Sequence, residues 1–386
     1  MSDPVEPSPP NIAVLILAAG WSSRMGAFKP LLPFGEDTVV GHVVSTVTEA
    51  AIGQTYVVVG NEAERIIPVV EARGASAVLN ADFNQGMMSS IKVGIATLPE
   101  SVAGVMILPV DVPLVRADTL ARIARSAATG QALVLRPCFR GQSGHPPFIS
   151  RRLFDEILSA PPEVTLRDIL DRHQQQTQSI SVIDSGILRD MDYSDEYRRL
   201  AACLPHRRHP DEAECAAMQD AIGTPEATRR HCAAVAQLAV EIADRLVAKG
   251  VPIDIDAVRA GALLHDIAKG EPDHATAGAR HVAAFGFAEV AEVVAVHMEM
   301  TFEAGQAIDE RHLVFLADKL IKGERRVGLE ERFAPALAAF ANDPAALAGA
   351  ERRRASVAGV LAAVESVVGP LGHVPAPASP LAVVER

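Results

Sequence analysis

The stretch between residues 16 and 35, ILAAGWSSRMGAFKPLLPFG, follows an apolar run and combines glycines with two cationic side chains. Glycine lets backbone N–H groups approach a ligand closely, because no Cβ stands in the way. Arg24 and Lys29 add positive charge to the same loop. Backbone donors and cations together predict a site for a polyanion such as a nucleoside triphosphate. The loop fits neither the Walker pattern nor the dinucleotide pattern G-x-G-x-x-G, so we interpret it as a phosphate site of a third kind.

A triphosphate needs a cation beside its charges, and a carboxylate at the end of an apolar run can hold one. Asp111 follows such a run in VMILPVDVPLV, at the end of an expected strand. Taken alone, an Asx turn before Pro113 explains this residue equally well. Beside a cationic, glycine-rich loop, we favour a Mg²⁺ site.

Four segments further along the chain each place one possible metal ligand on the apolar face of an expected helix. These ligands are His231, His265, His297 and Asp318. A lone histidine in such a position is more often a hydrogen-bonded core residue. A buried aspartate without a counter-charge is costly, however, and Asp266 directly follows His265. We therefore predict one or two divalent metals, and mixed imidazole and carboxylate ligands suit Fe, Mn, Zn or Ni.

The composition predicts sizeable aliphatic cores and argues against a general nucleic-acid-binding protein. Hydrophobic residues make up 49% of the 386 residues, and the net charge is −12. The four cysteines show no C-x-x-C spacing, which favours reduced thiols. No signal core and no apolar run of about 18 residues occurs. We expect a cytoplasmic protein that associates with neither nucleic acid nor membrane.

Residues 11–202 alternate short apolar runs with helical patterns, which indicates an α/β domain. Strands are expected over residues 12–18, 55–60, 76–79, 104–110, 132–136 and 179–183, and helices near residues 39–50, 62–73, 87–98, 117–128 and 151–158. Such alternation predicts a mostly parallel, doubly wound (Rossmann-like) sheet with helices on both faces. Ligands of these sheets bind beyond the carboxyl ends of the strands.

The second half of the chain has a different organisation. Residues 203–224 are polar and contain proline, so we expect a linker there. Thr224 and Pro225 are predicted as the N-cap and the first position of a helix. Residues 225–368 are predicted to form an all-α bundle, and residues 1–10 and 369–386 to be disordered tails.

In residues 17–29 the pattern LAAG-x-S-x-R-M-G-x-x-K resembles the signature of the molybdenum-cofactor nucleotidylyltransferases. Similar segments follow in that family's order, namely NADFNQGMMSSIKVG (80–94), PVDVPLV, GQSGHPPFISRRLF (141–154) and GILRDMDYSDEY (186–197). The resemblance covers residues 11–200. It implies transfer of a nucleotidyl group from a nucleoside triphosphate to a phosphorylated acceptor, with release of pyrophosphate.

The same resemblance implies roles for individual residues. Lys29 and Arg24 would hold the phosphates and stabilise the transition state, Asp111 would carry Mg²⁺, and Asp190 or Asp192 would be a second ligand. The implied nucleotide-binding residues are Leu17, Ala18, Ala19, Gly20, Ser22, Arg24, Met25, Gly26, Lys29, Asn80, Ser89 and Ser90, and the implied acceptor contacts are Gly144 and His145.

Ala19 gives the form LAAG, which is typical of family members that use CTP, whereas those that use GTP tend to show LAGG. The implied substrates are CTP and a molybdopterin-type acceptor, and a molybdoenzyme that receives the cofactor is an implied partner. Two positions depart from the cytidine pattern, because Val112 stands where Gln is common and Ser22-Ser23 replaces Ser-Arg. A sugar phosphate acceptor, or a regulatory or chaperone protein that binds nucleotide without turnover, are the alternatives.

The spacing His231 … His265-Asp266 … Asp318 resembles the HD-domain metal phosphohydrolases over residues 225–335. His274 and His297 are typical of members that hold two metals. Lys269 is implied to lie near substrate phosphates, whereas the place of His281 fits a helix surface as well as a position behind the metal ligands. The resemblance implies hydrolysis of a phosphate ester or anhydride, with His265 and Asp266 in the catalytic centre.

Overall fold

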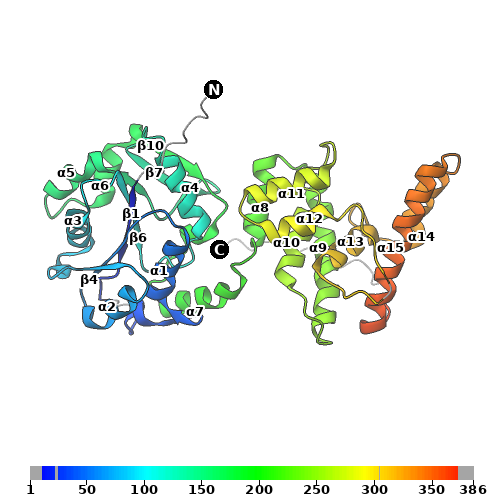
Figure 1. The fold of residues 1–386 in the computed structure, drawn as a ribbon, viewed down its shortest axis with the longest axis horizontal. Coiled ribbons are helices and arrows are strands. Elements are labelled where there is room, and N and C mark those ends of the chain that lie inside the picture. Colours follow the sequence, from blue (N-terminus) through cyan, green and yellow to red (C-terminus); the bar gives the residue numbers. More distant parts are fainter. Residues whose placement is uncertain (1–10, 22–24, 304, 373–386) are drawn as a thin grey trace, which may run out of the picture. The chain divides into compact units, whose positions relative to one another are not determined.

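The computed structural model describes residues 11–21, 25–303 and 305–372. The chain divides into two compact units, Met1–Arg207 and Arg208–Arg386, and each unit has its own apolar core. Figure 1 shows that the first unit contains a sheet with helices on both faces and that the second is mainly helical. Both predicted fold classes are therefore confirmed. Within the described residues, no helix has the length and apolarity that a bilayer crossing requires.

An eight-stranded sheet forms the centre of the first unit, with the strand order β10-β7-β9-β6-β1-β4-β5 and with β8 paired to β7. The strands are β1 (Ile12–Leu17), β4 (Thr55–Val59), β5 (Ser76–Leu79), β6 (Gly104–Pro109), β7 (Val134–Phe139), β8 (Gln142–Ser143), β9 (Phe148–Ser150) and β10 (Thr177–Ser181). Neighbouring long strands pair in parallel, whereas β9 is antiparallel to both β6 and β7. The six longer strands lie where the sequence predicts them, within three residues, but the short β8 and β9 are missed.

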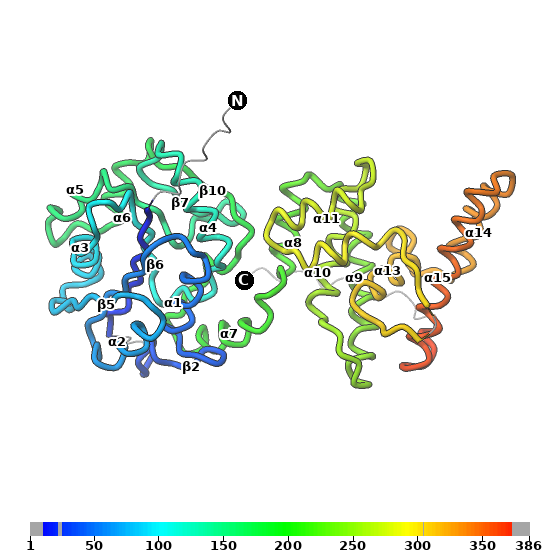
Figure 2. Tube along the Cα trace, in the orientation of Figure 1, coloured from blue at the N-terminus to red at the C-terminus, as the bar shows by residue number. Residues whose placement is uncertain are grey.

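Both faces of this sheet are covered by helices, which explains why β1 is buried along its whole length. Alternate residues of β1, among them Leu15 and Leu17, pack against α3 (Met87–Thr97), α5 (Phe154–Ser159) and α6 (Leu166–Arg172). On the other face α1 (Val39–Glu49) contacts α2 (Ala63–Glu71) and α4 (Ala117–Ala127). The tube in Figure 2 follows the same alternation of strand and helix along the chain.

Shorter elements of the first unit position the loops at the strand ends. They are the hairpin of β2 (Pro33–Phe34) and β3 (Asp37–Thr38), the 3₁₀ turns at Lys29–Leu31, Phe83–Gln85, Arg151–Leu153, Gln174–Gln176, Ser185–Leu188 and Leu204–His206, and the helix α7 (Ser194–Cys203). The helices α6 and α7 do not appear among the helices expected from the sequence.

The second unit is a helical bundle with one small hairpin. Its helices are α8 (Glu212–Ile222), α9 (Glu226–Val247), α10 (Ile255–Leu264), α11 (His274–Ala284), α12 (Ala288–Ala295), α13 (Glu310–Leu320), α14 (Leu329–Ala339) and α15 (Pro344–Val368), and the hairpin joins β11 (Ile321–Lys322) to β12 (Arg325–Arg326). The core is formed mainly by α9, α10, α13 and α15. The helical pattern of residues 225–368 is thus confirmed, apart from the hairpin.

Two expectations about the start of this unit need correction. The segment 203–224, predicted as a linker, contains α8, which begins with a capping box between Asp211 and Glu214 and contacts α10. Thr224 is not the N-cap of α9. Pro225 takes that position, and the Thr224 hydroxyl instead donates a hydrogen bond to the Ile267 carbonyl oxygen at 2.9 Å. This bond ties the start of α9 to the segment after α10.

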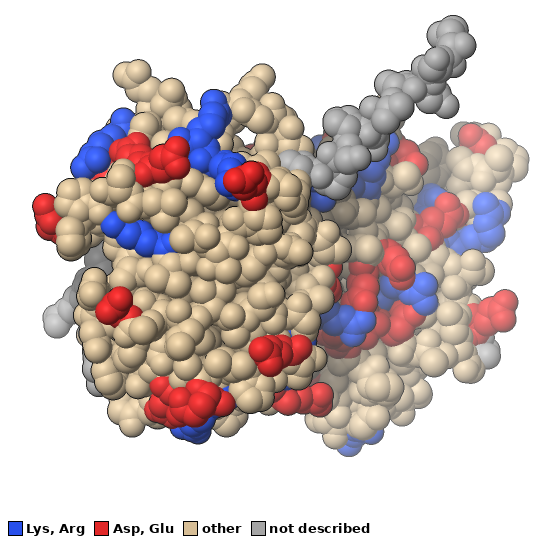
Figure 3. Space-filling model, turned by 60° about the vertical axis from the view of Figure 1, so that its left-hand side comes forward, with Lys and Arg blue, Asp and Glu red and all other residues tan. Residues whose placement is uncertain are grey.

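The surface in Figure 3 carries small, mixed groups of charged side chains. Lys and Arg lie close to Asp and Glu on this face, and large areas carry neither charge. A nucleic-acid backbone on this face would therefore meet both signs of charge rather than a continuous basic stripe.

A buried carboxylate connects the strand ends of the first unit. Asp184 is fully buried and accepts hydrogen bonds from the Arg116 backbone N–H (2.9 Å), the Thr119 hydroxyl (2.7 Å), the Gly186 backbone N–H (2.9 Å) and the Arg207 guanidinium. These donors come from the segment before α4, from α4, from the turn after β10 and from the end of the unit. Asp184 thereby fixes the beginning of the loop 185–192.

We predict that Asp184→Ala destabilises the first unit by about 3–5 kcal/mol, because Arg207 and three further donors lose their acceptor. The chain has one tryptophan, Trp21, so urea denaturation followed by its fluorescence reports on this unit. Asp171→Ala is the matched control. Asp171 is half-exposed and pairs with Arg136 at 3.2 Å, so its loss should cost less than about 1 kcal/mol. Equal stability of the two variants would contradict a structural role of Asp184.

Candidate functional sites

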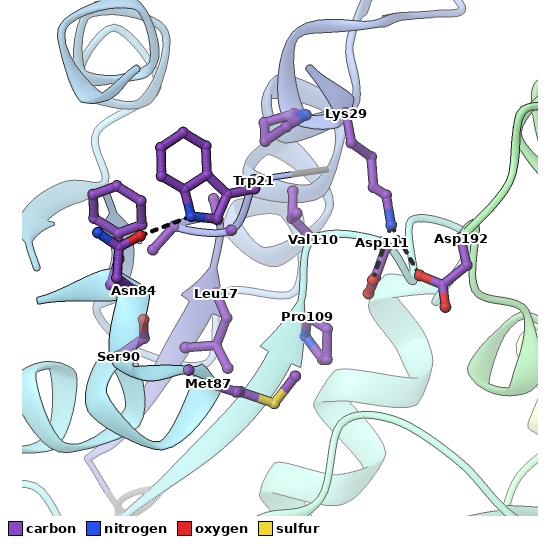
Figure 4. Close-up of a pocket in the computed structure, with 16 residues that line it drawn as sticks. Leu17, Trp21, Lys29, Asn84, Met87, Ser90, Pro109, Val110, Asp111 and Asp192 are labelled. Carbon is purple, nitrogen blue, oxygen red and sulfur yellow. Dashed lines mark hydrogen bonds and ion pairs between the residues drawn. The ribbon is translucent and has the colours of Figure 1, made fainter. Parts of the chain in front are cut away.

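A cavity of about 410 Å³ opens at the carboxyl ends of β1 and β6 in the first unit. Leu17 ends β1 and Pro109 ends β6, and both line the cavity. Of the predicted site residues, Leu17, Ala18, Ala19, Gly20, Lys29, Ser90, Asp111 and Asp192 line it. Figure 4 shows Trp21 and Asn84 on one side of this cavity and Lys29, Asp111 and Asp192 on the other. The edge of the sheet at which the sequence predicts a ligand is therefore hollow.

Lys29 lies between two carboxylates in this cavity. Its Nζ is 3.2 Å from Asp111 Oδ2 and 3.3 Å from Asp192 Oδ1, and the residue is 7% exposed. The two carboxylates come from distant parts of the chain and converge on one cation. Oxygen ligands of this kind are those that Mg²⁺ prefers. The Lys29 ammonium thus occupies the kind of place that a divalent cation would take, and the donor set fits Mg²⁺.

Hydrogen bonds fix the segment that carries Asp192. The Met191 backbone N–H donates to the Asp111 carbonyl oxygen at 3.0 Å. The Asp192 backbone N–H donates to Glu196 Oε2 at 2.7 Å, and Glu196 lies in the first turn of α7. Of the two predicted second ligands, Asp192 contacts Lys29 and lines the cavity. Burial, Asp111 and Asp192 all raise the pKa of Asp190, so Asp190 feels the negative charge of the same cluster.

Gly144 and His145, the predicted acceptor contacts, lie close to these carboxylates. The His145 backbone N–H donates to the Ile187 carbonyl oxygen at 2.9 Å, and the peptide bond before Pro146 is cis. A Cβ on Gly144 would lie 2.3 Å from the same Ile187 oxygen, so a larger residue would displace this loop. Burial lowers the pKa of His145, although the charges of Asp111 and Asp190 oppose the shift. A neutral imidazole is therefore favoured beside the carboxylates.

Asn80 is a positioning residue rather than part of the cavity wall. It is buried, and its Nδ2 donates to Ser89 Oγ (2.9 Å) and Ser90 Oγ (3.0 Å). Its Oδ1 accepts a hydrogen bond from the Asp82 backbone N–H at 2.9 Å. Asn80 therefore links the end of β5 to the first turn of α3, where Ser90 reaches the cavity.

The remaining predicted residues of the opening loop contribute less to the described cavity. Ser22 and Arg24 lie outside the described residues. Gly26 has the positive φ of 67° that favours glycine, but neither Gly26 nor Met25 is among the described residues that line the cavity. Their expected contacts with phosphate stay predictions.

Sequence reasoning missed the aromatic side of the cavity. Trp21 is 58% exposed, donates from Nε1 to Asn84 Oδ1 at 2.8 Å, and lies 5.2 Å from the Phe83 ring. Met87 completes this wall. The signal that could have found it is the chain's single tryptophan directly after LAAG.

The second unit brings all six predicted metal ligands into two adjacent triads. The first triad contains His231, His265 and Asp318, and the second contains Asp266, His274 and His297, with the ligand atoms of each within 4.8 Å of one another. Asp266 lies between them. Its Oδ2 is 3.6 Å from His265 Nε2, and its Oδ1 is 3.2 Å from His274 Nε2 and 3.6 Å from His297 Nε2. This carboxylate is therefore placed to bridge two metal ions.

Backbone carbonyl groups orient three of the four histidines. Nδ1 of His231, His265 and His297 each lies 2.7 Å from a carbonyl oxygen, that of Gly323, Ala262 and Val294 respectively. A carbonyl only accepts, so each Nδ1 carries a proton and Nε2 faces the carboxylates. Burial also lowers the pKa of His297, which favours the neutral form that a metal ligand must have.

His265 gives the sharpest test of whether a metal fits. The residue is fully buried, and its Nε2 has no hydrogen-bond partner among the described residues. A buried polar atom without a partner is costly, and a metal ion would satisfy it. Imidazole nitrogens and carboxylate oxygens together are the ligands of Fe, Mn, Zn or Ni. The donor set therefore fits a metal of this class.

Two lysines balance the carboxylates of this centre. Lys319, which the sequence analysis did not select, pairs with Asp318 and donates to the His297 carbonyl oxygen at 3.1 Å. Burial alone would raise the pKa of Asp318, but the Lys319 ammonium holds it well below its usual range. Lys269 pairs with Asp266 and is half-exposed, so its ammonium group can also contact a ligand that approaches from solvent. The His281 Nε2 lies 3.1 Å from Glu271 Oε1.

The sequence comparisons assign each unit to a family. Residues 14–177 match the MobA-like NTP transferase domain family, and residues 228–323 match the HD domain family. The chain carries a MobA-like NTP transferase domain and an HD domain. The first cavity therefore lies in the NTP transferase domain, and the six clustered ligands lie in the HD domain.

Individual relatives match part of the chain. The bifunctional protein GlmU of Mycobacterium sp. (strain KMS) is 34% identical over 143 residues, which cover 35% of this chain and 29% of that protein. GlmU of Clavibacter sepedonicus is 37% identical over 119 residues, with coverages of 30% and 24%. The chain thus spans less than a third of the length of these relatives. The crystal structure of Rv0371c from Mycobacterium tuberculosis H37Rv is 26% identical with a TM-score of 0.46, covering 50% of this chain and 99% of that one.

We predict that Asp318→Ala removes the metal of the HD domain, because this carboxylate reaches the first triad from α13 and no neighbouring side chain can replace it. Elemental analysis of the purified full-length protein measures the change, and circular dichroism checks that the helices persist. His281→Ala is the matched control, since it removes a surface histidine from α11, the helix that begins with His274. A folded parent protein without stoichiometric metal under metal-replete conditions would mean that the six residues form a hydrogen-bonded core.

Proposed function

We propose that the NTP transferase domain transfers a nucleotidyl group from a nucleoside triphosphate to a phosphorylated acceptor and releases pyrophosphate. The observation that carries this proposal is the convergence of Lys29, Asp111 and Asp192 in a cavity at the carboxyl ends of β1 and β6. A cavity of about 410 Å³ is of the size that holds a small ligand. Family membership of residues 14–177 supports the same reaction class.

In the proposed reaction an acceptor phosphate oxygen forms a bond to the α-phosphorus, and the bond from that phosphorus to the departing pyrophosphate breaks. Lys29, together with Arg24, stabilises the negative charge that develops on the phosphates. Asp111 and Asp192 would hold Mg²⁺, which supplies further charge neutralisation when bound. Asn80 positions Ser90, and the backbone of Ala18 to Gly20 forms the wall beside the nucleotide. We place the acceptor beside Gly144 and His145, near Asp111.

We further propose CTP as the nucleotide and a molybdopterin-type compound as the acceptor. Ala19 supports CTP, because it lines the cavity and is only 5% exposed, so its methyl group narrows the space for a base. The acceptor is proposed from the resemblance of residues 17–29 and 141–154 to the molybdenum-cofactor enzymes. A molybdoenzyme that receives the product is the corresponding partner.

For the HD domain we propose hydrolysis of a phosphate ester or anhydride. The two triads would hold one or two ions of Fe, Mn, Zn or Ni, and such a metal supplies a nucleophile by lowering the pKa of bound water. The half-exposed ammonium of Lys269 lies beside Asp266 and can bind a phosphate oxygen of the substrate.

Lys29→Ala should lower nucleotidyl transfer by at least about 100-fold, the size expected for the loss of one charge contact in a transition state. Pyrophosphate release with CTP and candidate acceptors, a sugar phosphate included, measures the effect. Because Lys29 is buried between two carboxylates, thermal unfolding is recorded in parallel and turnover is compared where both proteins are folded. Lys249→Ala, an exposed change at the end of α9, serves as the control. Full activity of Lys29→Ala would remove this residue from the mechanism.

With a matched acceptor, kcat/KM should favour CTP over GTP by at least about tenfold, or about 1.4 kcal/mol, because a purine needs more room than the Ala19 methyl group leaves. Ala19→Gly removes that methyl group and should lower the ratio of kcat/KM for CTP to kcat/KM for GTP. Steady-state kinetics with both nucleotides on both proteins test this. Equal use of GTP and CTP by the parent protein would contradict the cytidine assignment and leave the reaction class intact.

A further inference from the structure

A second cavity, of about 370 Å³, lies within the second unit and is lined by none of the six candidate metal ligands. Three elements form its wall. The segment after α12 contributes Val296 and Met300, the first turn of α13 contributes Arg311 and His312, and the middle of α15 contributes Arg352 and Arg353. The cavity thus lies between a helix of the core and the long C-terminal helix.

Three arginines line this cavity. Arg311 donates to Asp309 through Nε at 2.9 Å and through Nη2, so part of its charge is neutralised. Arg352 and Arg353 have no recorded ion pair or hydrogen bond with any described residue. Their neighbour Arg354 differs, because it pairs with Glu330 at 3.4 Å. Glu299, which is exposed, is the one carboxylate among the residues that line the cavity, so positive charge exceeds negative charge there.

His312 adds an independent observation. The residue is 1% exposed, and its Nδ1 lies 2.6 Å from Asp309 Oδ1. Its other ring nitrogen, Nε2, is buried and has no hydrogen-bond partner among the described residues. Buried ring nitrogens normally have a partner, and a polar group of a ligand in the cavity would supply one.

We propose that this cavity binds a phosphate monoester of about nucleotide size. Two guanidinium groups without a partner among the described residues suit the oxygens of a phosphate, and His312 supplies a third polar contact deeper in the wall. Val296 and Met300 offer apolar surface to the organic part of the ligand. A volume of about 370 Å³ is larger than inorganic phosphate needs and lies within the range of small-molecule sites. This proposal does not depend on the nucleotidyl transfer proposed above.

The test is isothermal titration of the full-length protein with CMP, AMP and inorganic phosphate, and with adenosine as the uncharged probe. The double variant Arg352→Ala/Arg353→Ala removes the proposed phosphate contacts. Arg354→Ala is the matched control, because it removes a neighbouring arginine that is already paired with Glu330. We expect the double variant to lose one nucleotide site, or to weaken it by at least about tenfold, since each charged hydrogen bond contributes at least that much. Arg354→Ala should bind as the parent does, and adenosine should not bind to this site.

Nucleotides also have two other proposed sites on this chain, so the same titrations are made on Lys29→Ala and Asp318→Ala. The site proposed here should persist in both variants, which separates its failure from failure of the transferase or metal site. Unchanged CMP, AMP and phosphate binding in the double variant would overturn the proposal. The proposal would also be overturned if all nucleotide binding of the parent disappeared with Lys29→Ala or Asp318→Ala. No binding would then remain to be assigned to the site of Arg352 and Arg353.

Discussion

A carboxylate that is removed from water must be matched by a cation or by several hydrogen-bond donors, and this requirement organises both domains. In the NTP transferase domain Asp184 receives four donors, one of them Arg207. In the HD domain Asp318 is paired with Lys319, which also holds the His297 carbonyl group. Each such group joins segments that are distant in sequence, so the charge requirement and the chain topology are satisfied by the same contacts.

The two proposed metal sites differ in how their carboxylates are matched by neighbouring groups. The side chains of Asp111 and Asp192 keep 30% and 38% of their exposure, and their partner is a lysine that can be replaced by another cation. Mg²⁺ retains several waters when it binds to proteins, which suits such an open pair of carboxylates. Asp266 and Asp318 keep only 4% and 7%, and histidines surround them. Such a mixture of imidazole nitrogens and carboxylate oxygens instead suits Fe, Mn, Zn or Ni.

Most site residues stand at or just beyond the ends of regular elements. Asp111 follows β6, His265 and Asp266 follow α10, His274 begins α11 and His297 follows α12. At these positions the backbone is no longer committed to a helix or sheet ladder, so carbonyl groups such as those of Ala262 and Val294 can orient a side chain. The regular elements fix where each end lies, and the ends carry the chemistry.

The sequence by itself determined the order of the long strands and core helices, because continuous apolar runs and helical spacing depend only on neighbours along the chain. It also indicated four of the candidate metal ligands, His231, His265, His297 and Asp318, because they lie at helical spacing from apolar residues, whereas Asp266 was found as the neighbour of His265 and His274 through the family resemblance. It missed β9, whose three residues have no periodicity of their own and are held by β6 and β7 on either side. It likewise placed a linker where α8 forms, because polar residues that pack against α10 look like a loop in isolation.

Only the tertiary structure decided how the chemistry-bearing groups pair. That Lys29 lies between Asp111 and Asp192, rather than beside Asp190, depends on the bond from Met191 to Asp111 across 80 residues of chain. That Asp266 faces both triads depends on the crossing of four helices. Lys319 of α13 reaches the His297 carbonyl oxygen after α12, and Arg352 and Arg353 of α15 line a cavity together with residues of α13. Spacing along a chain fixes which face a side chain occupies, whereas the partner on that face is set by packing between elements.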